Sequence, residues 1–215
     1  VVLDEYVSPR LLGMFFGAFF GESAQRGMSP LKGKLGEKIA ISDLTLVDDP
    51  HLLGGMNSCF LDAEGCFTKP ITIIEEGMFS NFLYHVESAR KENKLSTGHA
   101  CRSYSSGIST RLHNLVWPKG SMSTEKICLM TNKCLLVTQL EGQAGCNPIS
   151  GDISIGVQGF LYENGRKIQP VENVTLAGNF FDLLMNIQYF GDKYQPEISN
   201  CFIPALLIDG LTISG

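Results

Sequence analysis

Four polar residues have side chains that could contact a peptide: His99, Arg102, Ser150 and Asp152. They belong to glycine-flanked segments between expected strands, and loops of that kind often carry binding contacts. The Arg102 guanidinium could hold a peptide carbonyl or carboxylate, and Ser150-Gly151-Asp152 could offer backbone donors and an acceptor. Turn formation is the competing interpretation, because Ser150 and Asp152 can also bond their own backbone.

Metal binding is the second chemistry to test, because the chain has four histidines and seven cysteines. The histidines are His51, His85, His99 and His113. His99 lies near a thiol, in His99-Ala100-Cys101, but a pair does not make a zinc site, which needs about three protein ligands. The cysteines are odd in number and have no Cys-x-x-Cys pair. We therefore expect no metal here, and free, mostly buried thiols in a reducing cytoplasm.

Two pairs of neighbouring carboxylates are candidates for general acid and base chemistry, Asp48-Asp49 and Glu75-Glu76. Adjacent residues on a strand point to opposite faces of the sheet. Without a bulge, the two members of a pair cannot act on one substrate atom. We expect both pairs to lie in loops or turns.

One long helix is predicted over residues 8–27. Ser8 can accept backbone N–H groups at its start, Pro9 suits the first helical position, and Gly27 can adopt the left-handed conformation that ends a helix. The residues between them are apolar or small, which is typical of a helix packed in a core.

Strands dominate the second half of the chain. Strands are predicted over residues 44–47, 71–74, 78–84, 135–140, 153–162 and 203–213, and short helices over residues 85–93, from 123, and over 179–187. Two turns indicate hairpins, Glu75-Glu76-Gly77 and Glu163-Asn164-Gly165-Arg166, of which the second contains the Asn-Gly pair favoured in tight turns. The 23 glycines fit many tight turns.

Several segments occur in an order that resembles the TldD/PmbA family, peptidase-related proteins also called modulators of DNA gyrase. They include Ser96-Thr97-Gly98-His99-Ala100, Asn114-Leu115-Val116-Trp117-Pro118, Ser150-Gly151-Asp152-Ile153-Ser154 and Leu206-Leu207-Ile208-Asp209-Gly210. The resemblance covers nearly the whole chain. It implies an α+β fold with a mixed, mostly antiparallel sheet and a few helices.

The resemblance also bears on zinc. Catalytic members carry Leu-Leu-His-Glu-x-x-Gly-His-x-x-x-Gly in the first helix, and here Gly13, Met14 and Ala18 stand in place of His, Glu and His. A hydrolytic zinc needs its ligands and usually a carboxylate base, which these three residues cannot supply. The chain lacks these zinc residues and carries Asn200-Cys201 shortly before its last strand. In both features it resembles the PmbA (TldE) branch of the family.

The family implies a catalytically silent subunit. Zinc is then expected in a TldD-like partner, the substrate is a small or unfolded peptide held as an extended strand, and the assembly is an oligomer. Residues 1–215 are expected to be one C-terminal-like domain, a fragment that lacks the family's N-terminal domain.

Two alternatives stay open. The chain could be an independent hydrolase that uses His99 with Cys101 or Cys201, or a peptide-holding homo-oligomer without activity.

Charge and hydropathy limit which classes of binding partner the sequence predicts. The net charge of −5 argues against a phosphate-binding surface, so we expect no nucleic-acid partner. The longest apolar run, residues 11–21, is too short to span a bilayer and follows no basic leader, so we expect no membrane partner and a cytoplasmic location.

Overall fold

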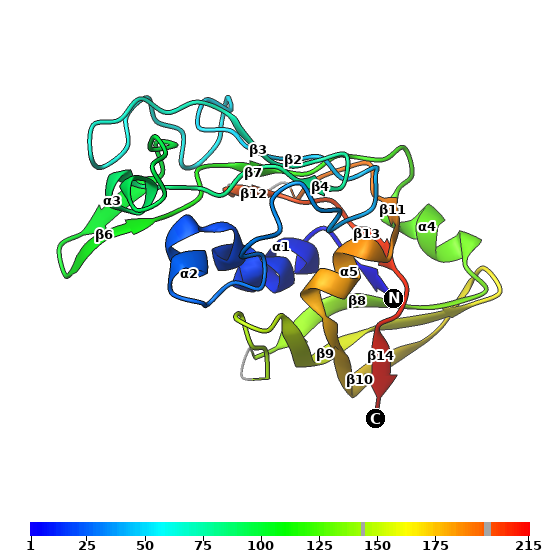
Figure 1. Cartoon of the computed structure of the whole chain (residues 1–215). Helices are drawn as coiled ribbons and strands as arrows, with labels where there is room; N and C mark the ends of the chain where they lie inside the picture. The colour runs from blue at the N-terminus through cyan, green and yellow to red at the C-terminus, as the bar shows by residue number, and fades with distance from the viewer. Residues whose placement is uncertain (143–144, 196–198) are drawn as a thin grey trace.

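The computed structural model describes residues 1–142, 145–195 and 199–215. In it a helical segment lies between a seven-stranded and a five-stranded β-sheet (Figure 1). Nearly all strand pairs are antiparallel, and the described exceptions are β1 with β8 and β12 with β7. The expected α+β fold with a mixed, mostly antiparallel sheet is confirmed.

The seven-stranded sheet has the order β11-β13-β1-β8-β9-β10-β14. Strands β9 and β10 of this sheet form a long hairpin. The predicted turn at Asn164-Gly165 joins them, with positive φ angles of 50° at Asn164 and 70° at Gly165. Its strands are β1 (Val2–Leu3), β8 (Lys133–Glu141), β9 (Asp152–Glu163), β10 (Arg166–Asn179), β11 (Ile187–Phe190), β13 (Leu206–Ile208) and β14 (Thr212–Ser214).

The five-stranded sheet has the order β12-β7-β2-β3-β4. The predicted turn at Glu75-Glu76-Gly77 joins β3 to β4, with φ angles of 49° at Glu76 and 84° at Gly77. Its strands are β2 (Leu46–Asp48), β3 (Ile71–Glu75), β4 (Met78–Phe79), β7 (Leu115–Val116) and β12 (Cys201–Phe202). A separate hairpin of β5 (Ala100–Ser103) and β6 (Ser106–Thr110) projects from one end of the molecule (Figure 1).

The first helical segment differs from the single predicted helix. It consists of α1 (Val7–Leu12), a 3₁₀ helix η1 (Gly13–Phe19) and α2 (Gly21–Gln25), and the backbone is extended at Phe20. Glycines disfavour a regular α-helix, and Phe20 forms a β-bridge with Leu83. Gly27 does adopt the expected left-handed conformation, with φ of 71°.

The start of this segment is also different from the prediction. Asp4, not Ser8, accepts the first free N–H groups, those of Tyr6 and Val7, at 2.9 and 2.7 Å. Ser8 lies inside α1, is buried, and donates its hydroxyl to the Leu3 carbonyl at 3.4 Å. Ser8 therefore links the helix to β1 and does not cap it.

The C-terminal segment, predicted as one strand over residues 203–213, is instead divided. β12 ends before it and pairs in the five-stranded sheet, whereas β13 and β14 pair in the seven-stranded sheet. Pro204 has no N–H to give to a ladder, and Gly210, with φ of 79°, turns the chain between β13 and β14. The strand predicted over residues 78–84 ends early, with β4.

The remaining helices are α3 (Val86–Arg90), α4 (Thr124–Met130) and α5 (Phe180–Met185). Ser123 accepts the Lys126 N–H and Asn179 accepts the Phe181 N–H, so the predicted starts of α4 and α5 are confirmed. No helix in the described ranges combines the length and apolar character needed to cross a membrane.

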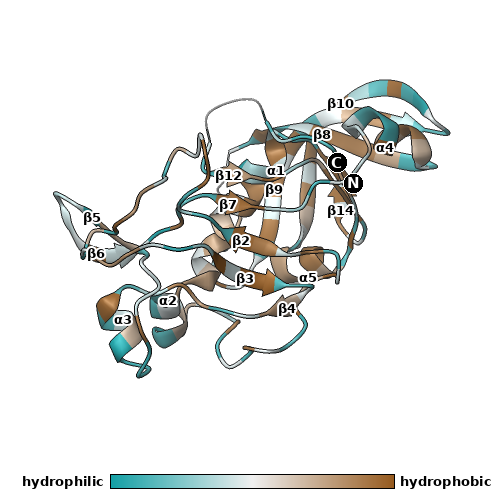
Figure 2. Cartoon of the chain, turned by 90° about the horizontal axis from the view of Figure 1, so that it is seen from above, coloured by the Kyte–Doolittle hydropathy of each residue, from teal (hydrophilic) through white to brown (hydrophobic). Residues whose placement is uncertain are grey.

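The core lies where the helical segment meets the two sheets. Phe15 of η1 stacks on Phe180 of α5 with ring centroids 5.0 Å apart. The ring centroids of Phe19 and Phe79 of β4 are 6.2 Å apart. Figure 2 shows apolar residues (brown) concentrated in β2, β3 and β9, and polar residues (teal) toward the far end of β10. Burial of these aromatic rings fixes η1 between the sheets.

Candidate functional site

A buried carboxylate, that of Asp48, ends strand β2. Leu46 and Asp48 alternate with the half-buried Val47, so both point into the interior. Asp48 has 0% of its surface exposed. Both of its carboxylate oxygens lie 3.0 Å from the backbone nitrogen of His113, which donates to them. A buried charge of this kind requires compensation.

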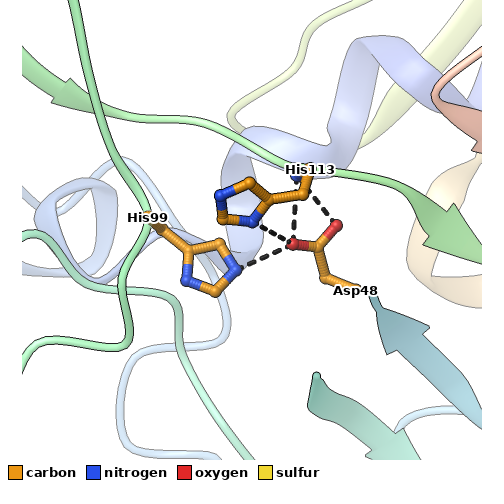
Figure 3. Close-up of side chains that lie close together, drawn as sticks. All are labelled: Asp48, His99 and His113. Carbon is orange, nitrogen blue, oxygen red and sulfur yellow. Dashed lines mark hydrogen bonds and ion pairs between the residues drawn. The ribbon is translucent and has the colours of Figure 1, made fainter. Parts of the chain in front are cut away.

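Two histidine rings converge on the same carboxylate (Figure 3). His99 Nε2 lies 2.8 Å from Asp48 Oδ2, and His113 Nδ1 lies 2.9 Å from that oxygen. His99 is fully buried and His113 is 1% exposed, and their ring centroids are 4.6 Å apart. One carboxylate oxygen and two imidazole nitrogens thus lie within 4.8 Å of one another, a set that could hold a metal ion.

A tight loop positions His99. A side chain at Gly98, where φ is 75°, would lie 2.8 Å from the Phe67 carbonyl oxygen. The Thr97 hydroxyl accepts the Tyr84 N–H at 2.7 Å and donates to the Tyr84 carbonyl at 3.1 Å. His99 Nδ1 lies 2.9 Å from the Thr97 carbonyl and 2.8 Å from its hydroxyl oxygen. The loop therefore holds the ring with Nε2 toward Asp48.

A buried amide fixes the position of His113. The side chain of the next residue, Asn114, donates to the Asp49 carbonyl at 2.8 Å and to the Ser58 hydroxyl at 3.0 Å. Its amide oxygen accepts the Asn57 N–H at 3.1 Å. These bonds tie the start of β7 to the loop that follows β2, so Asp48 and His113 are held in place from both sides.

Hydrogen bonding determines which nitrogen of His99 carries a proton. The Thr97 carbonyl only accepts, and the Thr97 hydroxyl already gives its proton to Tyr84, so His99 Nδ1 must be a donor. His99 Nε2 then faces Asp48 Oδ2 at 2.8 Å.

The surroundings of Asp48 favour the ionised form of its carboxyl group. Burial acts to raise the pKa of Asp48, but hydrogen bonds from His113 and His99 outweigh it and hold that pKa below its ordinary value. The hydrogen bonds from His113 and His99 therefore compensate much of the cost of burying this carboxylate.

Asp48 corrects the expectation that Asp48-Asp49 is a loop or turn pair. The expectation holds for Asp49, whose carboxylate accepts the His51 N–H at 2.8 Å in a turn. It is wrong for Asp48, which continues the inward series Leu44, Leu46 and Asp48, all buried. That series was the available signal, since an acid on the apolar side of a strand is rarely unpartnered.

The structure brings His99 into this cluster and leaves the other candidate peptide contacts elsewhere. Arg102 lies exposed on β5. Asp152 begins β9 in the other sheet, and Ser150 lies in the turn before it. The Ser150 hydroxyl donates to Asp152 at 2.5 Å, and the Asn179 amide donates to the Ser150 carbonyl at 3.0 Å and to the Asp152 carboxylate at 3.2 Å. These bonds are turn and cap interactions, and peptide contact by the four residues stays a prediction.

The residues at the positions that the sequence resemblance assigns to zinc do not fit a zinc ion. Gly13 and Ala18 have no donor atom, and Met14 offers only a thioether, which is not among the usual zinc ligands. Ala18 is 1% exposed, and a Cβ on Gly13 would meet open space.

The thiols are less buried than expected. All seven cysteines are free, but only Cys128 and Cys134 are buried, and the other five are half-buried. The Cys101 thiol lies 3.1 Å from the Ser109 hydroxyl across the hairpin, whereas His99 bonds Asp48. Burial raises the pKa of the Cys201 thiol to about 11, with a further contribution from the Asp48 charge.

Comparison with known proteins gives a consistent result. The family profile described as the PmbA/TldA metallopeptidase C-terminal domain matches residues 1–215. The chain is 35% identical over 215 residues to "Metalloprotease PmbA" of Escherichia coli O157:H7. This alignment covers all of this chain and 45% of that protein. The chain thus spans about half the length of the curated relatives it matches.

Solved structures agree with the sequence comparison. A Thermotoga maritima protein described as a candidate modulator of a DNA gyrase superposes with a TM-score of 0.90 at 31% identity, over 99% of this chain and 49% of that one. TldE of Thermococcus kodakarensis superposes with a TM-score of 0.83 at 29% identity, over 95% of this chain and 48% of that one.

Proposed function

Because this chain belongs to the PmbA/TldD family, we propose that it acts as a PmbA/TldE-like, non-catalytic subunit of a two-component zinc metallopeptidase. A TldD-like partner carries the zinc in this proposal, and the substrate is a small or unfolded peptide. This chain contributes structure and part of the substrate cleft.

The observation that carries the proposal is the helix η1. It holds Gly13, Met14 and Ala18, at the positions where the resemblance places two ligands and a base in catalytic members. Without these donors the helix cannot hold a zinc ion or generate a metal-bound nucleophile. The similarity to proteins named PmbA and TldE supports the same branch of the family.

An apolar surface supports the need for a partner. The loop between β2 and β3 exposes large side chains, with Leu53 at 100%, Phe60 at 77% and Phe67 at 85%. His51 packs on Phe60 with ring centroids 5.2 Å apart, and Leu61 forms a β-bridge with Phe67, so the loop has a defined shape. Exposed apolar residues gathered in one ordered loop are typical of an interaction surface.

The test combines the purified chain with the TldD-like protein of the same organism that carries the His-Glu-x-x-x-His helix. We expect a complex by light scattering and cleavage of fluorescent casein by the mixture, with no cleavage by this chain alone. Replacing the first histidine of the partner's motif with alanine is the matched control and should abolish cleavage.

Two results would contradict the proposal. In the first, the TldD-like protein does not bind this chain, and its own rate of peptide cleavage stays the same when the chain is added. This result would favour a peptide-holding homo-oligomer. The other is cleavage by this chain alone that is lost in Cys101→Ser or Cys201→Ser, which would favour an independent hydrolase.

A further inference from the structure

We propose that Asp48, His99 and His113 form a buried binding site for one zinc-type divalent metal ion. The ligand atoms are Asp48 Oδ2, His99 Nε2 and His113 Nδ1 (Figure 3). This site is separate from Gly13, Met14 and Ala18 of η1, and its role is structural: it joins three segments of the chain.

The geometry needs only a small adjustment. Asp48 Oδ2 lies 2.8 Å from His99 Nε2 and 2.9 Å from His113 Nδ1. Zinc bonds of about 2.0–2.2 Å in a tetrahedron place neighbouring donor atoms about 3.3 Å apart. The atoms must therefore separate by about half an ångström, which a change in the χ angles of the two rings can supply.

The outer contacts match those of a metal-bound histidine. A histidine ligand usually donates its second ring N–H to a carbonyl or carboxylate, which fixes the tautomer and the ring orientation. His99 Nδ1 makes this bond to the Thr97 carbonyl at 2.9 Å, so a neutral His99 offers its Nε2 lone pair to the site. Asp48 is held in turn by the backbone N–H of His113.

The charge and chemistry of the cluster select the ion. The carboxylate of Asp48 is fully buried, and a divalent ion bound to its oxygen would compensate its charge. Two imidazoles and one carboxylate suit zinc, whereas magnesium and calcium prefer an all-oxygen set. The three ligand residues are buried, so no coordination position is open to a substrate, which a hydrolytic zinc site requires.

The position in the chain explains what the ion would do. Asp48 ends β2, His99 precedes β5, and His113 precedes β7, so residues up to 65 positions apart are joined at one point. A metal ion that binds only the folded chain stabilises it by mass action.

The test uses the purified chain, stripped with a chelator, dialysed, and titrated with ZnCl₂. We expect one zinc per chain by elemental mass spectrometry, a higher Tm with zinc than without it, and the strong visible absorption of tetrahedral cobalt when CoCl₂ replaces zinc. Asp48→Asn and His113→Gln should weaken zinc binding by more than the roughly 10–100-fold that loss of an outer contact costs. His51→Gln, at an exposed histidine, is the matched control and should bind like the wild type.

Circular dichroism of each stripped variant checks that it folds, and the result on the wild-type chain does not depend on any variant. A stripped wild type that takes up no zinc from a micromolar excess would overturn the proposal and leave a proton on His99 as the compensating cation. Zinc held as tightly by Asp48→Asn and His113→Gln as by the wild type would also overturn it. No partner or activity enters this test, so its failure is distinct from failure of the proposed function.

Discussion

Gly77 sits in the turn between β3 and β4 under two constraints at once. Its φ is 84°, and a Cβ there would lie 2.5 Å from the Ala40 carbonyl oxygen and 2.7 Å from that of Ile41. Gly33 has a similar φ of 81° but open space around it. Gly33→Ala should therefore cost only the left-handed strain, about 1–2 kcal/mol, and Gly77→Ala clearly more. Urea unfolding of both variants measures the difference, and equal losses would contradict the clash.

At the scale of single residues, the sequence revealed part of the buried cluster. His99 was identified as a candidate, and the alternation Leu44, Leu46, Asp48 contained a signal for an inward carboxylate. His113 had no such signal, because nothing in the spacing of residues 48, 99 and 113 connects them. Their meeting depends on the pairing of β2 with β7, in which Asp48 lies opposite Leu115. That pairing is a long-range contact, which local patterns do not encode.

Phe180 is the point where α5 holds the helix η1. Its fully buried ring stacks on Phe15 at 5.0 Å and meets the edges of Phe16 and Phe19 at 6.3 and 6.4 Å. Phe180→Ala should lower the free energy of unfolding by about 3–5 kcal/mol through lost burial and a cavity. Phe181→Ala, at the half-buried neighbour on the same helix, is the control and should cost less. Chemical denaturation tests this order.

Glu5 connects three elements through one buried carboxylate, and its effect depends on pH. Glu5 follows β1, and its oxygens accept from Thr124 of α4 at 2.9 Å and from Lys193 after β11 at 2.8 Å. Burial acts to raise the pKa of Glu5, but the bonds from Lys193 and Thr124 outweigh it and lower that pKa. A lowered pKa in the fold gives stability that is present above the unfolded pKa of about 4.3 and is lost as pH falls through the folded pKa.

Lys193→Met should therefore destabilise the chain at pH 7 by about 1 kcal/mol, because Lys193 is exposed and water screens part of the pair. The difference from wild type should shrink as the pH falls below the unfolded pKa of about 4.3 and through the lower folded pKa of wild-type Glu5. Thermal unfolding from pH 7 to pH 3 measures it. A constant difference across this range would mean that the lysine acts through packing alone.

At the scale of elements, the sequence predicts turns and helix starts correctly where one residue type determines the local backbone conformation. Asn164-Gly165 and Glu76-Gly77 marked hairpin turns, and Ser123 and Asn179 marked helix starts. Ser8, Gly27 and the apolar residues between them are local signals, and they predict one continuous helix. Its break at Phe20 arises from a bridge to Leu83, a contact with a distant segment that overrides helix propensity.

For the whole molecule, the proposed subunit role predicts that the exposed loop between β2 and β3 contacts the TldD-like partner. Phe60→Ser and Phe67→Ser remove apolar surface that is already in water, at 77% and 85% exposure, so the Tm should change little. Buried aromatic residues often dominate the affinity of an interface, and loss of either ring should weaken the complex by about tenfold or more. Ile168→Ser, at a half-exposed apolar residue on β10, is the control for loss of surface hydrophobicity. Titration of each variant against the partner, followed by light scattering, separates the two outcomes: weakening by the loop variants alone places the partner on this loop, and equal affinity for all three variants removes the loop from the interface.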